Sequence, residues 1–174
     1  MNKISLLFIL SVLITFSAYA QDDIKITHAP YLQNLGENEV TVVWTANKPS
    51  IGWVELAPDD GTHYYQTERP KFFNAKNGIK LTSTVHSVHL TGLKPGTRYR
   101  YRVYSQEVLS HVGWRVIYGN VAATSVYGKQ PLTFLTSDHG RQSVNFAMVN
   151  DIHGKSDVLE KLVSHCDLKK TDMF

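Results

Sequence analysis

The sequence predicts a mostly β chain: a β-sandwich, followed by a strand, a turn and a helix that begin an α/β unit. Three observations lead to this prediction. Alternating apolar and polar residues fill positions 23–137, and Pro, Gly, Asn and Asp residues separate the runs. A continuous apolar run then ends at Asp151 and His153. Beyond Gly154 the apolar residues recur with the period of a helix.

Residues 1–20 have the features of a secretory signal peptide. Lys3 gives a positive start, an apolar segment follows it, and Ala18-Tyr19-Ala20 forms a small-residue cleavage site before Gln21. A membrane anchor is the alternative, but the apolar segment is shorter than the roughly 20 residues that cross a bilayer. We therefore expect a periplasmic or secreted protein, with no transmembrane segment after the signal is cleaved.

Charge and cysteine content limit the possible partners. The formal charge of +3 includes Lys3, and no dense basic run remains beyond the leader, so nothing indicates nucleic-acid binding. Cys166 is the only cysteine. Because one thiol cannot form an internal disulfide, an exported domain of this sequence has to be held together by its apolar core.

Positions 22–137 are predicted to form the sandwich. One or two edge strands are expected between Tyr64 and Lys80, and the other strands are expected at Val40–Thr45, Gly52–Ala57, Val85–Leu90, 98–103 and Leu132–Thr136. In the 98–103 strand the period of two places Tyr99, Tyr101 and Val103 toward the core. The same period makes Arg98, Arg100 and Arg102 a solvated face, with a phosphate-binding patch as the alternative.

Two other features of this region invite a functional interpretation. His86 and His89 are three residues apart on a strand, so they lie on opposite faces and do not form a metal site together. Residues 108–130 form a long connection, which in a folded domain is often functional. This connection either reaches over a catalytic domain or, as we prefer, forms a surface hairpin that packs its own aromatic side chains.

The last part of the chain is predicted to be a strand, a turn and a helix. The apolar run Val144–Val149 is typical of a strand buried on both faces of a parallel sheet. The helix presents a single apolar stripe that comprises Val158, Leu159, Leu162, Val163 and Cys166. Asp157 with Glu160 is a candidate N-cap and capping box, and Ser156 is the competing cap.

Asp151 and His153 are the candidate metal ligands. They follow the predicted strand directly, at the end where open α/β sheets bind their ligands. A carboxylate and an imidazole two residues apart can converge on one divalent or trivalent metal. The segment Asp151-Ile152-His153-Gly154 resembles the first metal-binding motif of the calcineurin-like metallophosphoesterases. That resemblance implies a dinuclear centre of Fe, Zn or Mn and hydrolysis of a phosphate ester by a metal-bound hydroxide.

The earlier part of the chain carries a second resemblance. The spacing Leu93-x-Pro95-x-Thr97-x-Tyr99 resembles the tyrosine corner of fibronectin type III domains, with Trp44 as the core aromatic residue. Together with the segment 29–35, it makes positions 23–137 similar to the fibronectin-like N-terminal domain of purple acid phosphatases. True purple acid phosphatases have Gly-Asp-x-Gly at the first motif, so His153 places the catalytic part in the broader calcineurin-like group, without an iron-tyrosinate centre.

The two resemblances, in this order, imply an exported metal-dependent phosphoesterase that acts on a phosphate ester. Residues 143–174 would be the start of its catalytic domain, on which the sandwich docks. The family's other ligand motifs are absent from these residues, so we expect the 174-residue chain to be the inactive N-terminal part of the enzyme, with no general acid that can be assigned. The alternative is a non-catalytic fibronectin-like module that binds a surface or docks on a partner.

Overall fold

The computed structural model describes residues 22–125, 128–150, 152–167 and 171, so the predicted leader lies outside the described residues. Within these ranges no helix is long and apolar enough to cross a bilayer. The described elements are, in chain order, β1 (Ile26–Gln33), β2 (Glu39–Pro58), β3 (Lys71–Phe73), β4 (Ala75–Lys76), β5 (Ile79–Lys80), β6 (Thr82–Thr91), β7 (Arg98–Val112), β8 (Arg115–Ala123), β9 (Leu132–Leu135) and α2 (Ser156–Ser164).

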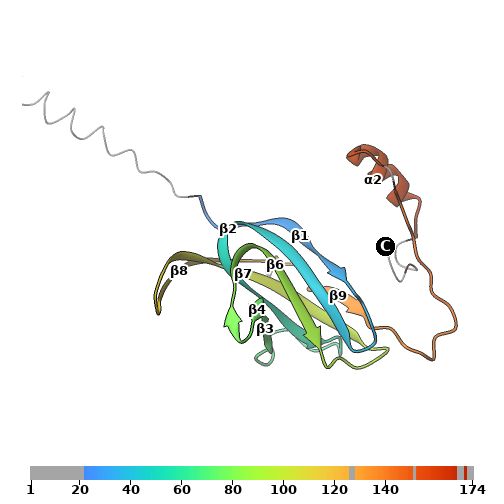
Figure 1. Ribbon diagram of the computed structural model, residues 1–174. Helices are drawn as coiled ribbons and strands as arrows, with labels where there is room; N and C mark the ends of the chain where they lie inside the picture. Colours follow the sequence, from blue (N-terminus) through green and yellow to red (C-terminus); the bar gives the residue numbers. More distant parts are fainter. Residues whose placement is uncertain (1–21, 126–127, 151, 168–170, 172–174) are drawn as a thin grey trace, which may run out of the picture.

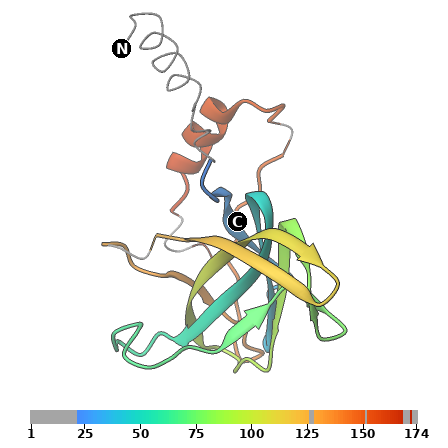
Figure 2. The ribbon, with the colours of Figure 1, turned by 90° about the vertical axis from the view of Figure 1, so that its left-hand side faces the viewer.

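The long strand β2 belongs to both layers of a curled sheet (Figures 1 and 2). Its first part, residues 39–46, pairs with β1 and β6, and its second part, residues 50–58, pairs with β7 and β3. All these pairings are antiparallel. The register with β6 shifts between Thr45 and Ser50, where β2 passes from one layer to the other. The two strands predicted at 40–45 and 52–57 are therefore one continuous strand, and Pro49 lies at the register shift, where a proline is tolerated.

The second layer is completed by two strands that share one edge of β7. β9 pairs with residues 98–101 of β7, and β8 pairs with residues 104–112. Since β2 occupies the other edge of β7, β8 and β9 lie one after the other along the same edge, like one interrupted strand. The long connection predicted over 108–130 is thus mostly the β7–β8 hairpin.

The core lies between the two layers and follows the alternation of the sequence. Side chains at every second position face inward, and the most deeply buried apolar ones are Val40, Val42, Trp44, Val54, Val88, Leu90 and Val103. The Trp44 ring is fully buried, and its Nε1 donates to Ser105 Oγ at 2.9 Å across the two layers. The predicted role of Trp44 as the core aromatic residue is confirmed.

The predicted tyrosine corner is confirmed. The Tyr99 hydroxyl accepts a hydrogen bond from the backbone N–H of Lys94 at 2.9 Å, and the Tyr99 ring stacks on Phe134 of β9. Leu93, which begins the corner, is part of the core. The hydroxyl therefore fixes the connection between β6 and β7 at the end of the sandwich.

The prediction of a solvated arginine face is wrong for two of the three residues. Arg98 is exposed, but Arg100 and Arg102 are buried, with 7% and 3% of their surface exposed. The segment 59–69 folds over this face. The Arg100 guanidinium donates to the carbonyls of Pro58 and Thr62, and it pairs with Asp60 at 3.1 Å. The period of two gave the correct face, but the loop that covers that face is not visible in a periodic pattern.

Tyr64 is the centre of this cover. Its hydroxyl donates to the backbone carbonyl of Glu55 at 2.9 Å, and its ring lies 5.4–5.7 Å from the guanidinium carbons of Arg69, Arg100 and Arg102. Burial raises the pKa of the Tyr64 hydroxyl above its usual range, with nearby Glu55 adding to the effect. Cation–π contacts and carbonyl acceptors thus replace water around the two buried arginines.

The predicted buried strand at Val144–Val149 is not formed. Only Phe146 makes an isolated β-bridge, and Val144, Phe146 and Met148 have 58–80% of their surface exposed. The physical reason is that a strand of a parallel sheet needs neighbouring strands for its backbone hydrogen bonds, and no other described segment forms such a sheet beside it. In Figure 1 the chain after β9 leads away from the sandwich, and α2 stands apart from the strands.

Tyr99→Phe tests the tyrosine corner. Loss of the hydroxyl leaves the Lys94 N–H without its partner, so we expect the free energy of unfolding to fall by about 1 kcal/mol. Urea unfolding of the protein measures this change. Tyr101→Phe is the matched control, because Tyr101 lies two residues along the same strand and outside the corner. Equal destabilisation by the two variants would contradict the assigned role of the Tyr99 hydroxyl.

Candidate functional site

The predicted turn after the apolar run is present. His153 and Gly154 have consecutive positive φ angles of 50° and 71°, and the Lys155 N–H donates to the Ile152 carbonyl at 3.0 Å. This is a tight turn with both central residues in the left-handed region. Few residues other than glycine adopt that region, although histidine is one of the types that is enriched there. His153 therefore has a backbone conformation that few residues other than glycine adopt.

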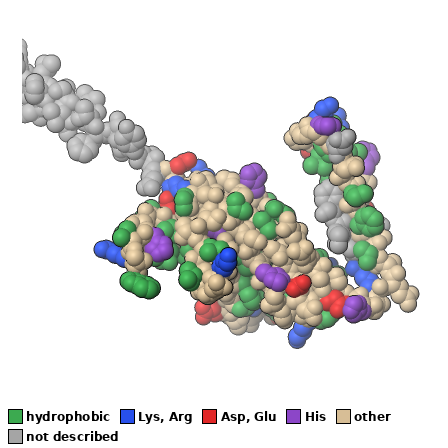
Figure 3. All heavy atoms as spheres, in the orientation of Figure 1, with side chains coloured by type: hydrophobic (Ala, Val, Ile, Leu, Met, Phe, Trp, Pro, Cys, Tyr) green, Lys and Arg blue, Asp and Glu red, His purple; other side chains and the backbone are tan. Residues whose placement is uncertain are grey.

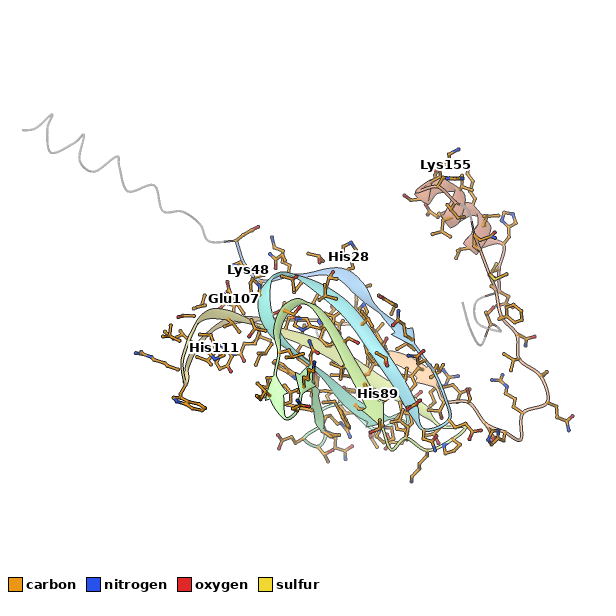
Figure 4. The ribbon with its side chains drawn as sticks, viewed as in Figure 1. His28, Lys48, His89, Glu107, His111 and Lys155 are labelled. Atoms are coloured by element: carbon orange, nitrogen blue, oxygen red, sulfur yellow. The ribbon has the colours of Figure 1, made fainter. Side chains whose placement is uncertain are left out.

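Helix α2 follows this turn directly, as predicted (Figure 4). The N-cap is Lys155, whose carbonyl accepts the Leu159 N–H at 3.1 Å, and no side chain caps the helix. The predicted cap at Asp157 or Ser156 is therefore wrong, because the tight turn begins the helix earlier. Asp157 lies in the first turn instead, where its negative charge favours the helix dipole. None of the helix side chains is buried.

The structure tests only half of the predicted ligand pair. Asp151 lies outside the described residues, whereas His153 occupies the first left-handed position of the turn. Among the residues that the structure describes, no three His, Cys, Asp or Glu side chains are grouped so that they could hold a metal ion. The described donors therefore do not fit a dinuclear centre by themselves. The assignment of Asp151 and His153 as ligands stays a prediction.

A buried polar network lies where β2 passes between the layers. Ser50 Oγ is 2.8 Å from His86 Nε2, Asn74 Nδ2 is 3.4 Å from His86 Nδ1, and Ser50 Oγ also lies 3.3 Å from the Ser83 carbonyl. The side chains of Ser50 and His86 are fully buried. Gly52 completes the packing, because a Cβ atom there would lie 2.4 Å from His86 Nδ1 and 2.7 Å from Trp44.

The serine, histidine and asparagine of this network resemble a nucleophilic triad, but their hydrogen bonds run in the opposite direction. The Asn74 amide nitrogen faces Nδ1 and can only donate, so Nδ1 is the acceptor and the ring proton is on Nε2. His86 Nε2 therefore donates to Ser50 Oγ, whose own proton goes to the Ser83 carbonyl. Ser50 is thus not activated by a base, and its burial keeps substrate away. The network is structural and not catalytic.

Burial lowers the pKa of His86 to about 4. Its hydrogen-bond partners favour the same neutral form, since protonation of Nδ1 would place two donors face to face. The prediction that His86 and His89 lie on opposite faces is confirmed. His89 is exposed, and its Nε2 lies 3.1 Å from a Glu39 carboxylate oxygen (Figure 4). The burial of His86 could have been predicted from the sequence. His86, Val88 and Leu90 are alternate residues of one strand, so their side chains lie on the same face.

A cavity of about 380 Å³ lies between β1 and the connection after β8. Ile26, Ala29 and Pro30 line one side, and Ala123, Lys129 and Leu132 line the other. The Arg102 guanidinium closes it by donating to the carbonyls of Ser125 and Lys129. Its Nε atom is buried without a hydrogen-bond partner. Arg102 is itself one of the residues that line the cavity, and its two carbonyl contacts hold the connection in place.

The fold and the corner define the class of protein. A curled antiparallel β-sandwich with a tyrosine corner and a buried tryptophan is a fibronectin-type domain. Residues 28–118, just over half of the chain, match the family described as "Purple acid Phosphatase, N-terminal domain". The chain therefore belongs to this family, and its sandwich is that family's N-terminal domain.

Two further comparisons concern curated proteins and solved structures. No curated protein matches the chain. A solved structure described as a computer-based redesign of a β-sandwich protein is similar to it with 19% identity and a TM-score of 0.39, over 66% of this chain and 96% of that one.

The burial of neutral His86 predicts a specific loss of stability in acid. The unfolded chain takes up a proton near the ordinary histidine pKa of about 6.5, whereas the folded protein resists it down to about pH 4. Stability is thus fully present above pH 6.5 and declines as the pH falls, by about 3 kcal/mol at pH 4. Urea unfolding at a series of pH values measures this decline.

Substitutions on the two faces of β6 separate the His86 contribution from that of the carboxylates. His89→Gln should keep the acid-dependent decline, because His89 is exposed. His86→Gln should be less stable at neutral pH but should lose much less stability between pH 6.5 and pH 4. Parallel pH profiles for the wild type and His86→Gln would show that another group is responsible.

Proposed function

We propose that this chain supplies the sandwich and the first two metal ligands of an exported metal-dependent phosphoesterase. The observation that carries the proposal is the order of its parts. A sandwich of the purple acid phosphatase N-terminal family precedes a left-handed turn at His153 and Gly154, and a helix begins directly after that turn. The family match supports a phosphatase origin, and the Asp-x-His-Gly segment supports a metal-dependent reaction.

The roles of individual residues in this proposal are limited to binding. Asp151 would offer a carboxylate oxygen and His153 an imidazole nitrogen, and the tight turn would hold His153 at a fixed position before α2. The metals, when bound, supply charge neutralisation and an activated water for attack on phosphorus. The other ligands and the general acid would come from sequence outside these 174 residues.

The last segment exposes apolar residues, which is consistent with a catalytic domain of which this chain holds only a part. Phe146 and Met148 in the extended segment, and Leu159 and Leu162 in α2, have 37–80% of their surface exposed. In the proposed enzyme these side chains would be covered by the remaining strands and helices of the catalytic domain, on which the sandwich would dock. Export to the periplasm or outside the cell, directed by residues 1–20, is part of the proposal.

Hydrolysis assays on the full-length gene product test the proposed function. We expect turnover of an aryl phosphate or an aryl phosphodiester that depends on added Mn, Zn or Fe. Asp151→Ala and His153→Ala should each lower this turnover by at least about a hundredfold, because each removes a metal ligand. His139→Ala is the matched control, since His139 is an exposed histidine of the linker that pairs with Glu37.

The outcomes separate the enzyme from the docking module. No turnover from a folded, metal-supplied protein would contradict the proposal and favour a non-catalytic module that binds a surface or partner. Turnover that persists in both ligand variants would show that the reaction uses a different site. Metal content of the purified variants provides a second readout, because loss of ligands should lower the metal bound per chain.

A further inference from the structure

The β7–β8 hairpin extends beyond the sandwich. Pairing of β7 with β2 ends at Glu107, whereas pairing of β7 with β8 continues to Val112 and Arg115. Residues 109–118, the hairpin tip, therefore form a ribbon of two strands, and no third strand pairs with it in the described part of the chain. Figures 1 and 2 show this ribbon reaching past the other strands. An isolated two-stranded ribbon has little stability of its own.

The hairpin tip exposes a group of large apolar side chains. Trp114 is fully exposed at 104%, and it follows Gly113, which forms the turn with a φ angle of 57°. The other exposed apolar residues of the tip are Leu109, Val112, Ile117 and Tyr118. The expectation that this hairpin packs its own aromatic residues is therefore wrong. In the space-filling view hydrophobic side chains gather at the end of the ribbon (Figure 3).

The charge of the tip has one sign. Arg115 is the only formally charged residue from 108 to 123, and this stretch contains no Asp or Glu. His111 lies near the end of the hairpin, and the nearest acid on β7, Glu107, is neutralised by Lys48 at 2.7 Å at the base (Figure 4). A convex, apolar and positively charged tip complements an anionic bilayer, where tryptophan, tyrosine and arginine favour the interface.

The start of the described chain lies against the same hairpin. Asn120 of β8 donates to the Asp23 carboxylate at 3.1 Å, and Asn47 donates to the Asp23 carbonyl at 2.9 Å. The first described residues therefore lie at the base of this hairpin.

We propose that the hairpin tip is a membrane-surface docking element, which places Trp114 and Val112 in the interface of an anionic lipid bilayer with Arg115 at the phosphate headgroups. The single sign of its charge and its exposed tryptophan favour a lipid surface over a neutral protein surface. This inference is independent of the proposed catalytic function, because it uses none of the residues of the metal site.

Sedimentation with lipid vesicles tests the proposal on the full-length exported protein. We expect binding to vesicles of phosphatidylglycerol and phosphatidylcholine, and weak binding to phosphatidylcholine alone. Trp114→Ala should weaken the binding by about tenfold or more, because the buried area of the indole is lost. Arg115→Gln should weaken binding to the anionic vesicles by about fivefold and leave binding to neutral ones unchanged.

The control is Ile79→Ala, which removes another exposed apolar side chain, from β5, and should bind like the wild type. Brominated lipids should quench the wild-type tryptophan emission, because Trp114 is exposed while Trp44 is buried in the core. Equal vesicle binding by the wild type and Trp114→Ala, or no binding by the wild type, would overturn the proposal. Self-association in solution that is lost in Trp114→Ala would also overturn it, by assigning the tip to a second copy of the chain.

Discussion

The passage of β2 from one layer to the other is the constraint on which the rest of the sandwich depends. One strand of 20 residues pairs with four others, so the position of its bend fixes the register of both layers. The bend is held from inside by Trp44, Gly52 and His86, which occupy one compact volume. A side chain at position 52 would collide with the other two, so the close approach of the layers at this point requires glycine.

His86, Trp44, Lys48 and Glu107 bring buried polar groups to the region of the bend, and these find their partners in different ways. The histidine stays neutral within a chain of hydrogen bonds, and the Trp44 indole N–H reaches Ser105 across the layers. Lys48 and Glu107 form a largely buried ion pair at the base of the hairpin, beside Gly119, where a Cβ atom would lie 2.7 Å from a Glu107 oxygen. Buried polar groups that are fully partnered favour one arrangement over others, which suits a domain without disulfides.

Some surfaces outside the core are covered by other parts of the chain, and others stay exposed. Arg100 and Arg102 are covered by the chain itself, through the segment that contains Tyr64. The hairpin tip and the segment from Val144 to α2 keep large apolar side chains exposed. Exposed apolar surface is a feature of interaction sites, and it is the observation behind the two proposals for these segments.

The sequence by itself determined the features that depend on local pattern. Alternation of residues determined the main strands and the core face, and the Leu93 to Tyr99 spacing determined the corner, because a strand has a period of two and the corner needs a fixed reach. The turn at His153 and the helix after it followed from Gly154 and the change of period. The tertiary structure decided three other features: the joining of two predicted strands into β2, the cover over the arginines, and the absence of a strand at Val144–Val149. The continuity of β2 depends on pairing with β6 and β7, and the cover comes from a segment distant from the arginines in sequence. A strand at Val144–Val149 would need neighbouring strands, which the described part of the chain does not supply. A local pattern contains no information about such pairing.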